Sequence, residues 1–271
     1  MQETIEDYSP AGTHYRYTPG SGDVTWVLIH GVGLRKNMWR YQHDSLSRHG
    51  DVVSYDMLGH GQSANPPGER TFKDFAMQLE ELVAHLKLQN IAVVGFSMGS
   101  LVALVFAALF PEKIDRLALL HSYYKRTEEE CAGVRARFEM TKQQGISSTV
   151  DMALERWFSQ EYIQHHPEVM DQIREGFEVH PEGGYIKAYG LFSYAEEEIA
   201  TYDLKTIRCP VLVMTGDQDV GSTVDIAHRL AADLNPVELI INKGHKHMAP
   251  VEHARTISDQ LIKFLSSDKQ V

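Results

Sequence analysis

Short apolar runs alternate along the chain with longer stretches of amphipathic, helix-forming sequence. The apolar runs predict buried strands, because parallel strands that are covered on both faces carry few polar positions. They fall at residues 24–30, 51–56, 91–95, 115–121, 210–215 and 237–242. Helical periodicity occurs between and after them, at 72–88, 98–110, 223–234 and 251–265. This alternation predicts an α/β fold with a mostly parallel central sheet and helices on both faces.

One long segment, residues 125–202, lacks a convincing strand and shows only helical periodicity rich in charged and aromatic residues. It is too long and too regularly patterned to be a structureless loop. We therefore expect a helical cap, or lid, inserted between two sheet strands and packed over the strand ends. The core domain then comprises residues 1–124 and 203–271.

The charge of the chain narrows the choice of partners. The 271 residues suit one core domain with an insertion. Its 26 basic and 37 acidic side chains give a formal net charge of −11, and such a surface repels nucleic acid and anionic lipid. The longest strongly apolar run, 101–110, is about half as long as a membrane-spanning helix. We expect a small-molecule substrate, with neither nucleic acid nor membrane as a partner, and the oligomeric state stays open.

The cysteine and histidine content gives no sign of a disulfide framework or a metal site. Cys131 and Cys209 are the only cysteines and form no CxxC pair, in keeping with a reducing compartment. The N-terminal stretch is acidic and lacks the apolar core of a signal peptide. The neighbouring His165 and His166 have no companion ligands at metal-site spacing. We therefore expect a cytoplasmic protein that uses neither a cofactor nor a metal.

The strongest local signal for chemistry is the pentapeptide Gly95-Phe96-Ser97-Met98-Gly99. It lies between a predicted strand and a predicted apolar helix, which is the context of a nucleophile elbow. The flanking glycines allow neighbouring backbone to approach the sharp turn. The start of the helix adds positive partial charge where an oxyanion would form. Ser97 is therefore the predicted nucleophile, and a serine that only caps the helix is the alternative.

A glycine-bounded loop, HGVG at 30–33, follows the first of the predicted strands. Such a loop can turn a backbone N–H toward Ser97. Together with the N–H of Met98, this donor would complete an oxyanion hole. A tight turn that merely requires glycine is the simpler interpretation of the loop when it is taken alone.

A serine nucleophile needs a histidine to take its proton and a carboxylate to fix that histidine. Behind an elbow of this type, the order along the chain is serine, then acid, then histidine. Two later predicted strands are followed by GDQD at 216–219 and by GHKH at 244–247. Both motifs stand at the carboxyl ends of strands, where open α/β sheets place their sites. Each motif offers two candidate residues.

These motifs together resemble the α/β-hydrolase family. The resemblance is carried by HGVG at 30–33, YDMLGHGQS at 55–63, GFSMGS at 95–100, GDQD at 216–219 and GHKHMAPVEH at 244–253. It is closest to the small single-chain members, which include carboxylesterases, enol-lactonases, C–C hydrolases and cofactor-free haloperoxidases. It covers the chain outside residues 125–202 and implies the α/β-hydrolase fold with a helical cap.

The resemblance also implies which residues act. The catalytic triad would be Ser97, Asp219 and His247. The backbone N–H groups of Val32 and Met98 would form the oxyanion hole. No metal or cofactor takes part in this implied reaction.

The resemblance decides between the two candidates in each late motif. The family's tail places an acidic residue and a histidine at a fixed distance after the catalytic histidine, and residues 252–253 stand at that distance from His247 rather than from His245. Family loops likewise place the acid third after the glycine that ends the strand, which favours Asp219 over Asp217. The physical reason is that the base must leave its loop at one depth above the nucleophile.

The implied reaction is hydrolysis of a small or medium carboxylic ester or lactone through an acyl-enzyme. Alternatives are C–C hydrolysis of a ring-cleavage product, perhydrolase activity, and a non-catalytic binding protein on the same fold. C–C hydrolases of the family often carry a tryptophan directly after the catalytic histidine, where this chain has Met248. Asp56 and His60 belong to the family's structural turn and are not expected to react. Residues expected to line an apolar pocket under the cap, if they do not simply pack in its core, are Trp157, Phe158, Tyr189, Phe192 and Met248.

Overall fold

The computed structural model describes residues 3–181 and 183–266. The outermost parts of the predicted core domain, 1–2 and 267–271, and residue 182 of the predicted cap lie outside the described residues. The described chain is built on one sheet with the strand order β1-β2-β4-β3-β5-β6-β7-β8. Its strands are β1 (Ile5–Tyr8), β2 (His14–Thr18), β3 (Thr25–Ile29), β4 (Asp51–Tyr55), β5 (Ile91–Phe96), β6 (Arg116–Leu120), β7 (Val211–Gly216) and β8 (Val237–Asn242).

Strands β3 to β8 run parallel to one another, whereas β2 pairs antiparallel with both β1 and β4. Every residue of β3, β5, β6 and β7 is buried, as expected for strands covered on both faces. The predicted mostly parallel α/β sheet is therefore confirmed. The sequence did not predict the antiparallel β1 and β2, because β1 is exposed along its whole length and has no apolar run.

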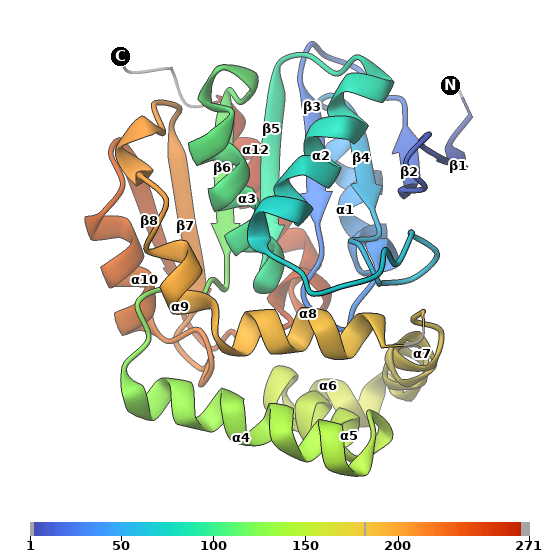
Figure 1. Cartoon of the computed structure of the whole chain (residues 1–271). Coiled ribbons are helices and arrows are strands. Elements are labelled where there is room, and N and C mark those ends of the chain that lie inside the picture. Colours follow the sequence, from blue (N-terminus) through green and yellow to red (C-terminus); the bar gives the residue numbers. More distant parts are fainter. Residues whose placement is uncertain (1–2, 182, 267–271) are drawn as a thin grey trace.

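Helices cover both faces of the sheet (Figure 1). In that view α2 and α3 lie in front of the strands, and α1 and α12 lie behind them. The predicted helix at 251–265 is divided in the structure, because the backbone of His253 (φ −121°, ψ 39°) leaves helical geometry. The helices of the core are α1 (Arg40–Leu46), α2 (Phe72–Leu86), α3 (Met98–Leu109), α10 (Val224–Ala232), α11 (Ala249–Glu252) and α12 (Ala254–Ser266), with 3-10 turns η1 (Lys36–Trp39), η2 (Pro111–Lys113) and η3 (Leu204–Thr206).

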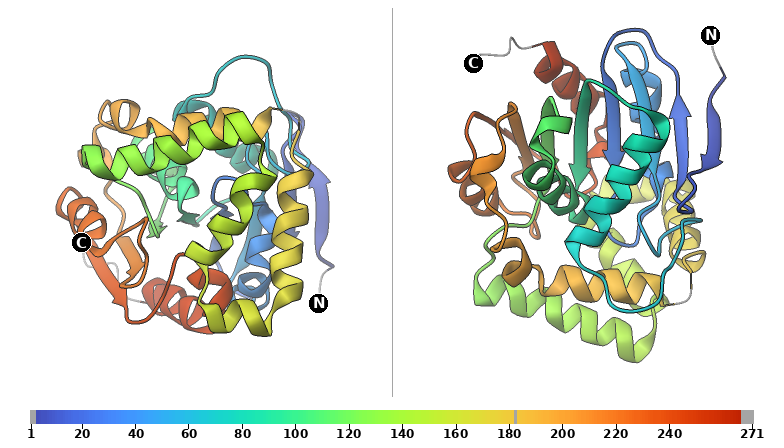
Figure 2. Two further views of the ribbon diagram at one scale, coloured as in Figure 1. Left: turned by 90° about the horizontal axis from the view of Figure 1, so that it is seen from below. Right: turned by 45° about the horizontal axis from the view of Figure 1, so that its top comes forward.

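The segment between β6 and β7, which we call the cap (residues 125–202), is helical, as the sequence predicts. Its helices extend across the carboxyl ends of the parallel strands (Figures 1 and 2). A capping box of Thr127 and Glu130 starts the first of them. The same Glu130 accepts from Arg229 of α10 and so ties the cap to the core. The cap helices are α4 (Glu128–Gln144), α5 (Ser147–Trp157), α6 (Gln160–His165), α7 (Pro167–Glu178), α8 (Gly184–Ser193) and α9 (Ala195–Ile199).

Cys131 in the cap and Cys209 before β7 are both buried free thiols. No helix among residues 3–181 and 183–266 is long and apolar enough to cross a bilayer.

Asp56 anchors the turn that follows β4. Its carboxylate is buried and accepts the backbone N–H of Lys36 at 2.8 Å and that of Gln62 at 3.2 Å. The Nδ1 atom of His14 lies 3.2 Å from Oδ2, and the buried ammonium of Lys36 lies 3.7 Å from the same oxygen. Burial acts to raise the pKa of Asp56, but the hydrogen bond from His14 and the charge of Lys36 hold it well below its usual range. These contacts give Asp56 a structural role.

Asp56→Asn should lower the free energy of unfolding by about 3 kcal/mol at neutral pH, because it leaves the buried ammonium of Lys36 with only one carboxylate, that of the more exposed Glu6 at 3.7 Å. The folded-state pKa of Asp56 lies below the unfolded value of about 3.9, so its stabilising effect is full above that value and is lost as the pH falls through the folded pKa. Urea unfolding of both proteins at neutral pH and at about pH 3 measures the effect. The difference in unfolding free energy between the wild type and Asp56→Asn should be smaller in acid. A difference that stays constant with pH would contradict this account.

Candidate active site

Ser97 occupies a sharp turn between β5 and α3. Its backbone has φ 55° and ψ −120°, a conformation that is strained for any residue with a side chain. Two contacts hold the turn. The N–H of Ser97 donates to the carbonyl of Leu120 at 2.9 Å, and the hydroxyl of Ser100 donates to the carbonyl of Ser97 at 2.5 Å. The strand–turn–helix context predicted for the elbow is therefore present.

Close backbone contacts require glycine on both sides of Ser97. A Cβ at Gly95 would lie 2.3 Å from the carbonyl oxygen of Gly99, and a Cβ at Gly99 would lie 2.4 Å from the carbonyl oxygen of His30. The HGVG loop thus packs directly against the elbow. At Gly31 a Cβ would lie 3.1 Å from the Cβ of Ser97. This packing brings the loop that carries the predicted oxyanion donor beside the serine.

Neutral histidines hold the HGVG loop in place. The N–H of Gly33 donates to Nε2 of His60 at 3.1 Å, and Nε2 of His180 donates to the carbonyl of Gly33 at 3.0 Å. At the start of the loop, Nε2 of His30 accepts the N–H of Met57 at 2.9 Å. Burial lowers the pKa of His30 to about 4 and also lowers the pKa values of His60 and His180. His60 therefore positions the loop rather than titrating near neutral pH.

The carboxylate of Asp219 accepts four hydrogen bonds. Its Oδ2 atom lies 2.7 Å from Nδ1 of His247 and 2.7 Å from Nδ1 of His121. Its Oδ1 atom accepts the backbone N–H groups of Gly221 at 2.9 Å and Ser222 at 3.0 Å. Because an ionised carboxylate only accepts, both Nδ1 atoms carry protons. In its neutral form, His247 then has Nε2 free of a proton and able to take one.

Burial and hydrogen bonding together set the charge states of Asp219 and His121. Burial acts to raise the pKa of Asp219, but the charge of His247 and the hydrogen bonds from both histidines hold it well below its usual range. Burial lowers the pKa of His121, which is therefore neutral at neutral pH. Ligand atoms of these three residues lie within 4.8 Å of one another, a spacing that a metal could use. Both Nδ1 protons point at Asp219, however, so the geometry is that of a hydrogen-bonded network.

The structure separates the two candidates in each late motif. His247 bonds Asp219, whereas the ring of His245 stacks on that of His253 with centroids 3.8 Å apart. Burial lowers the pKa of His245 to about 4. Asp217 is exposed and accepts a backbone N–H from the tail, a contact typical of a turn residue. The contacts thus unite the same aspartate and histidine that the family resemblance favours.

Ser97 and His247 line one cavity of about 40 Å³, together with Val32. Met98, whose N–H is the other predicted oxyanion donor, is fully buried at the first position of α3. Most of the remaining wall of the cavity comes from the cap. Three of the residues predicted to line a pocket there do so, namely Trp157, Tyr189 and Phe192.

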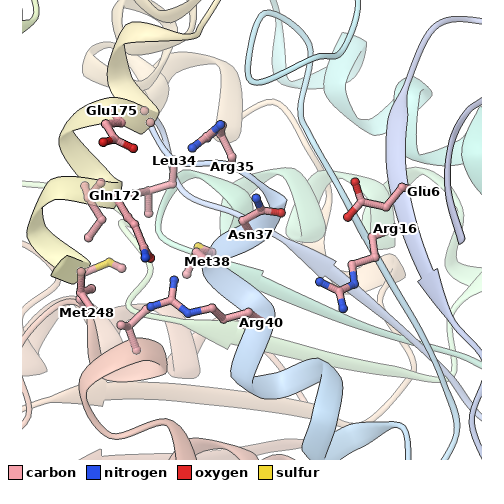
Figure 3. Close-up of a pocket in the computed structure, with 15 residues that line it drawn as sticks. Glu6, Arg16, Leu34, Arg35, Asn37, Met38, Arg40, Gln172, Glu175 and Met248 are labelled. Atoms are coloured by element: carbon pink, nitrogen blue, oxygen red, sulfur yellow. The ribbon is translucent and has the colours of Figure 1, made fainter. Parts of the chain in front are cut away.

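Two other predicted pocket residues lie elsewhere. Phe158 is fully buried and stacks on Tyr162 with ring centroids 5.2 Å apart, because it stands just past the end of α5 and turns into the cap core. Met248 lines a separate cavity of about 310 Å³ between α7 and the segment that leads into α1. Figure 3 shows this second cavity, with Gln172 and Arg40 among the side chains around it.

Sequence reasoning missed His121. The residue directly follows β6 and has a positive φ of 50°. A signal was available, since a histidine stood at the carboxyl end of the predicted strand 115–121, beside the strand that leads to Ser97. The family motifs do not predict a role for His121, because none of them includes this residue.

The tail that carries His247 is tied to the cap. The ammonium of Lys246 donates to the carbonyls of Glu155 at 2.9 Å and Phe158 at 2.7 Å. The carboxylate of Glu252 accepts the N–H of Ser159 at 3.1 Å as well as its hydroxyl. The junction between α5 and α6 is therefore joined to the tail after β8 by side-chain hydrogen bonds.

The sheet order, the elbow after β5 and the site at the carboxyl ends of the strands define a hydrolase-type α/β protein. A family model described as the alpha/beta hydrolase fold matches residues 26–254, and the chain belongs to this family.

Individual relatives agree with this assignment. The chain is 29% identical to (E)-2-((N-methylformamido)methylene)succinate hydrolase from Acinetobacter baylyi, over 98% of this chain and 99% of the relative. It is 27% identical to 3-oxoadipate enol-lactonase 2 from the same organism, over 73% of this chain and 72% of the relative. Among solved structures, the enol-lactonase from Burkholderia xenovorans is similar with a TM-score of 0.82 and 26% identity, covering 97% of this chain and 100% of that one.

Single substitutions should separate the paired candidates. His247→Ala and Asp219→Asn are each expected to lower kcat by about a thousandfold or more, because they remove the predicted base or the carboxylate predicted to orient it. His245→Ala and Asp217→Asn should each cost less than about tenfold, since neither contacts the network. Initial rates on a short ester, with thermal melting as the folding control, measure this. An inactive His245→Ala variant would show that the base is assigned to the wrong histidine.

His121→Ala should lower kcat by about tenfold and leave KM unchanged, because it removes a charge-assisted hydrogen bond from Asp219 without touching the substrate cavity. His121→Asn should recover part of the loss, since asparagine tolerates the positive φ and its amide can donate. Steady-state kinetics of both variants test this positioning role. An effect confined to KM, or a stability loss without a change in kcat, would rule it out.

Proposed function

We propose that the chain is a serine hydrolase that cleaves carboxylic esters or lactones of small or medium size. The observation that carries the proposal is the hydrogen bond between Asp219 and His247, together with the shared cavity that His247 and Ser97 line. A nucleophile, an orienting acid and a base, in this order along the chain, are the groups required for acyl transfer.

In the proposed reaction, Nε2 of His247 takes the proton of the Ser97 hydroxyl as Oγ attacks the carbonyl carbon. The carbonyl oxygen becomes an oxyanion, stabilised by the N–H groups of Val32 and Met98. Collapse of this intermediate breaks the C–O bond, and the alcohol leaves with the proton from His247. Water then attacks the acyl-enzyme with His247 again as base, which releases the acid and regenerates Ser97.

The environment of the network favours this sequence of steps. Asp219 stays ionised and stabilises the imidazolium that forms on His247 at each proton transfer. Each oxyanion donor is worth about 3 to 4 kcal/mol in the transition state, so the position of the HGVG loop matters nearly as much as the triad. The buried histidines that hold this loop are neutral, so they do not place a second positive charge next to the oxyanion.

The cavity argues for a short acyl group. Its volume of about 40 Å³ is small for a ligand cavity and leaves little room for a long acyl chain. We therefore propose a small-molecule substrate. From the charge and motifs of the sequence we also propose that the protein acts in the cytoplasm, on neither nucleic acid nor membrane, and that the reaction uses no metal or cofactor. The enol-lactonase relatives support a lactone as one form of the scissile bond.

A second reaction, hydrolysis of an acyl–nitrogen bond, is favoured by one observation. The Acinetobacter baylyi relative that aligns over 98% of this chain is named for a compound with a formamido group. The same nucleophile, base and oxyanion donors would serve this reaction, with an amine in place of the alcohol.

Ser97→Ala should abolish turnover while the thermal midpoint stays close to that of the wild type, because the change removes only the attacking oxygen. The test uses a panel of esters and lactones of graded chain length and one matched amide, together with labelling by a fluorophosphonate probe. The wild type should label at Ser97 and prefer short acyl groups. Turnover by Ser97→Ala above about one per cent of wild type would refute the nucleophile, and faster cleavage of long-chain triglyceride would refute the substrate size.

A further inference from the structure

Two arginines line the cavity that contains Ser97 and His247. They are Arg137 of α4 and Arg156 of α5. No carboxylate of residues 3–181 and 183–266 forms a salt bridge with either one within 4.0 Å. Among the described residues, Arg126, Arg135, Arg174, Arg229 and Arg255 do form such pairs, whereas other arginines, for example Arg40, do not. What distinguishes Arg137 and Arg156 is that they share a cavity with Ser97 and His247. The Nε atom of Arg137 is buried without a hydrogen-bond partner, as are those of Arg135 and Arg229.

The positive charge of this pair is not compensated by the cavity wall. Burial lowers the pKa of Arg156, and the charge of Arg137 lowers it further, so the two guanidinium groups repel each other. Arginine side chains stay charged at neutral pH in proteins. Burial raises the pKa values of the neighbouring phenols Tyr123 and Tyr185, which therefore stay neutral. Partly buried charges that repel each other are costly unless an anion joins them.

Asp219, the buried carboxylate of the hydrogen-bonded network, cannot supply this partner. Asp219 acts electrostatically on Arg156, but all four acceptor positions of its carboxylate are occupied by His121, His247 and two backbone N–H groups. The protein as a whole carries a net charge of −11. Two arginines without a carboxylate partner in the cavity of Ser97 therefore contrast with the overall charge and favour a bound anion there.

We propose that the substrate carries a carboxylate in addition to the reacting acyl bond, and that Arg137 and Arg156 bind this carboxylate beside Ser97. This inference rests on the proposed function, which places the reacting acyl bond at Ser97. The planar guanidinium donors match the two oxygens of a carboxylate, and the small cavity restricts the spacer to a short chain. The substrate class is the half-ester, or the corresponding lactone, of a short dicarboxylic acid, and the product is the dicarboxylate.

A binding experiment tests the arginine pair without the reaction. Succinate, glutarate and the neutral analogue succinamide are titrated into Ser97→Ala by calorimetry, with inorganic phosphate as a further anion. The dicarboxylates should bind and succinamide should not. Binding should weaken at least about tenfold in Arg137→Gln and Arg156→Gln, because each change removes charged hydrogen bonds. Lysine at either position should retain part of the affinity, since it keeps the charge without the planar fork.

Arg40→Gln is the matched control. Arg40 lines the second cavity (Figure 3) and not the one that contains Ser97. Its substitution should leave dicarboxylate binding unchanged, and thermal melting of every variant reports on folding. The inference is overturned if the dicarboxylates do not bind, if Arg40→Gln alone weakens them, or if phosphate binds more tightly than either dicarboxylate. It is also overturned if both arginine variants fold and bind as the parent does.

A kinetic arm uses the enzyme with Ser97 intact. Monomethyl succinate and methyl butyrate present the same four-carbon acyl chain, ending in a carboxylate or a methyl group. Acid release should be faster from monomethyl succinate, and Arg156→Gln should remove at least about tenfold of this preference while methyl butyrate is little affected. Equal rates for the two esters in the wild type would overturn the inference and leave the serine mechanism intact. Dicarboxylate binding that depends on the arginines, in a protein without Ser97 reactivity, would support the inference and refute the proposed function.

Discussion

The carboxylate of Asp219 is the group on which the arrangement of the site depends. It is buried and charged, and such a group is stable only when its acceptor positions are filled. The four donors come from the ends of three neighbouring strands. His121 follows β6, Gly221 and Ser222 lie in the loop after β7, and His247 lies in the loop after β8. The parallel pairing of β6, β7 and β8 places these ends side by side, so the fold and the network require each other.

The sequence was sufficient to predict the parts of the molecule that depend on local pattern. Strands β3 to β8 were predictable because each is rich in apolar, strand-forming residues and several are apolar nearly from end to end. The elbow was predictable because its glycines are needed for backbone contacts. The same reasoning failed where the pattern is ordinary. The exposed β1 reads as polar loop, and the break at His253 falls inside a stretch with regular helical periodicity.

Residues that face the cavity were harder to predict than the candidate catalytic set. Aromatic side chains in the cap have the same periodicity whether they line the cavity, as Trp157 does, or pack behind it, as Phe158 does. A charged residue on a helix is normally solvated, so Arg137 and Arg156 gave no signal in the sequence. Only the packing of α4 and α5 over the strand ends brings their charges toward Ser97. The core thus supplies the groups proposed to react, and the cap supplies those proposed to select.

The bonds between the tail and the cap have a consequence for how this architecture can diversify. Lys246 and Glu252 form hydrogen bonds with the stretch from Glu155 to Ser159, although some ninety residues separate the two segments. A cap transplanted from a relative without its own tail would lose these contacts and shift the loop that presents His247. Because the two distant segments depend on each other's contacts, we expect a substitution in one of them to be accompanied by a substitution in the other as related chains diverge.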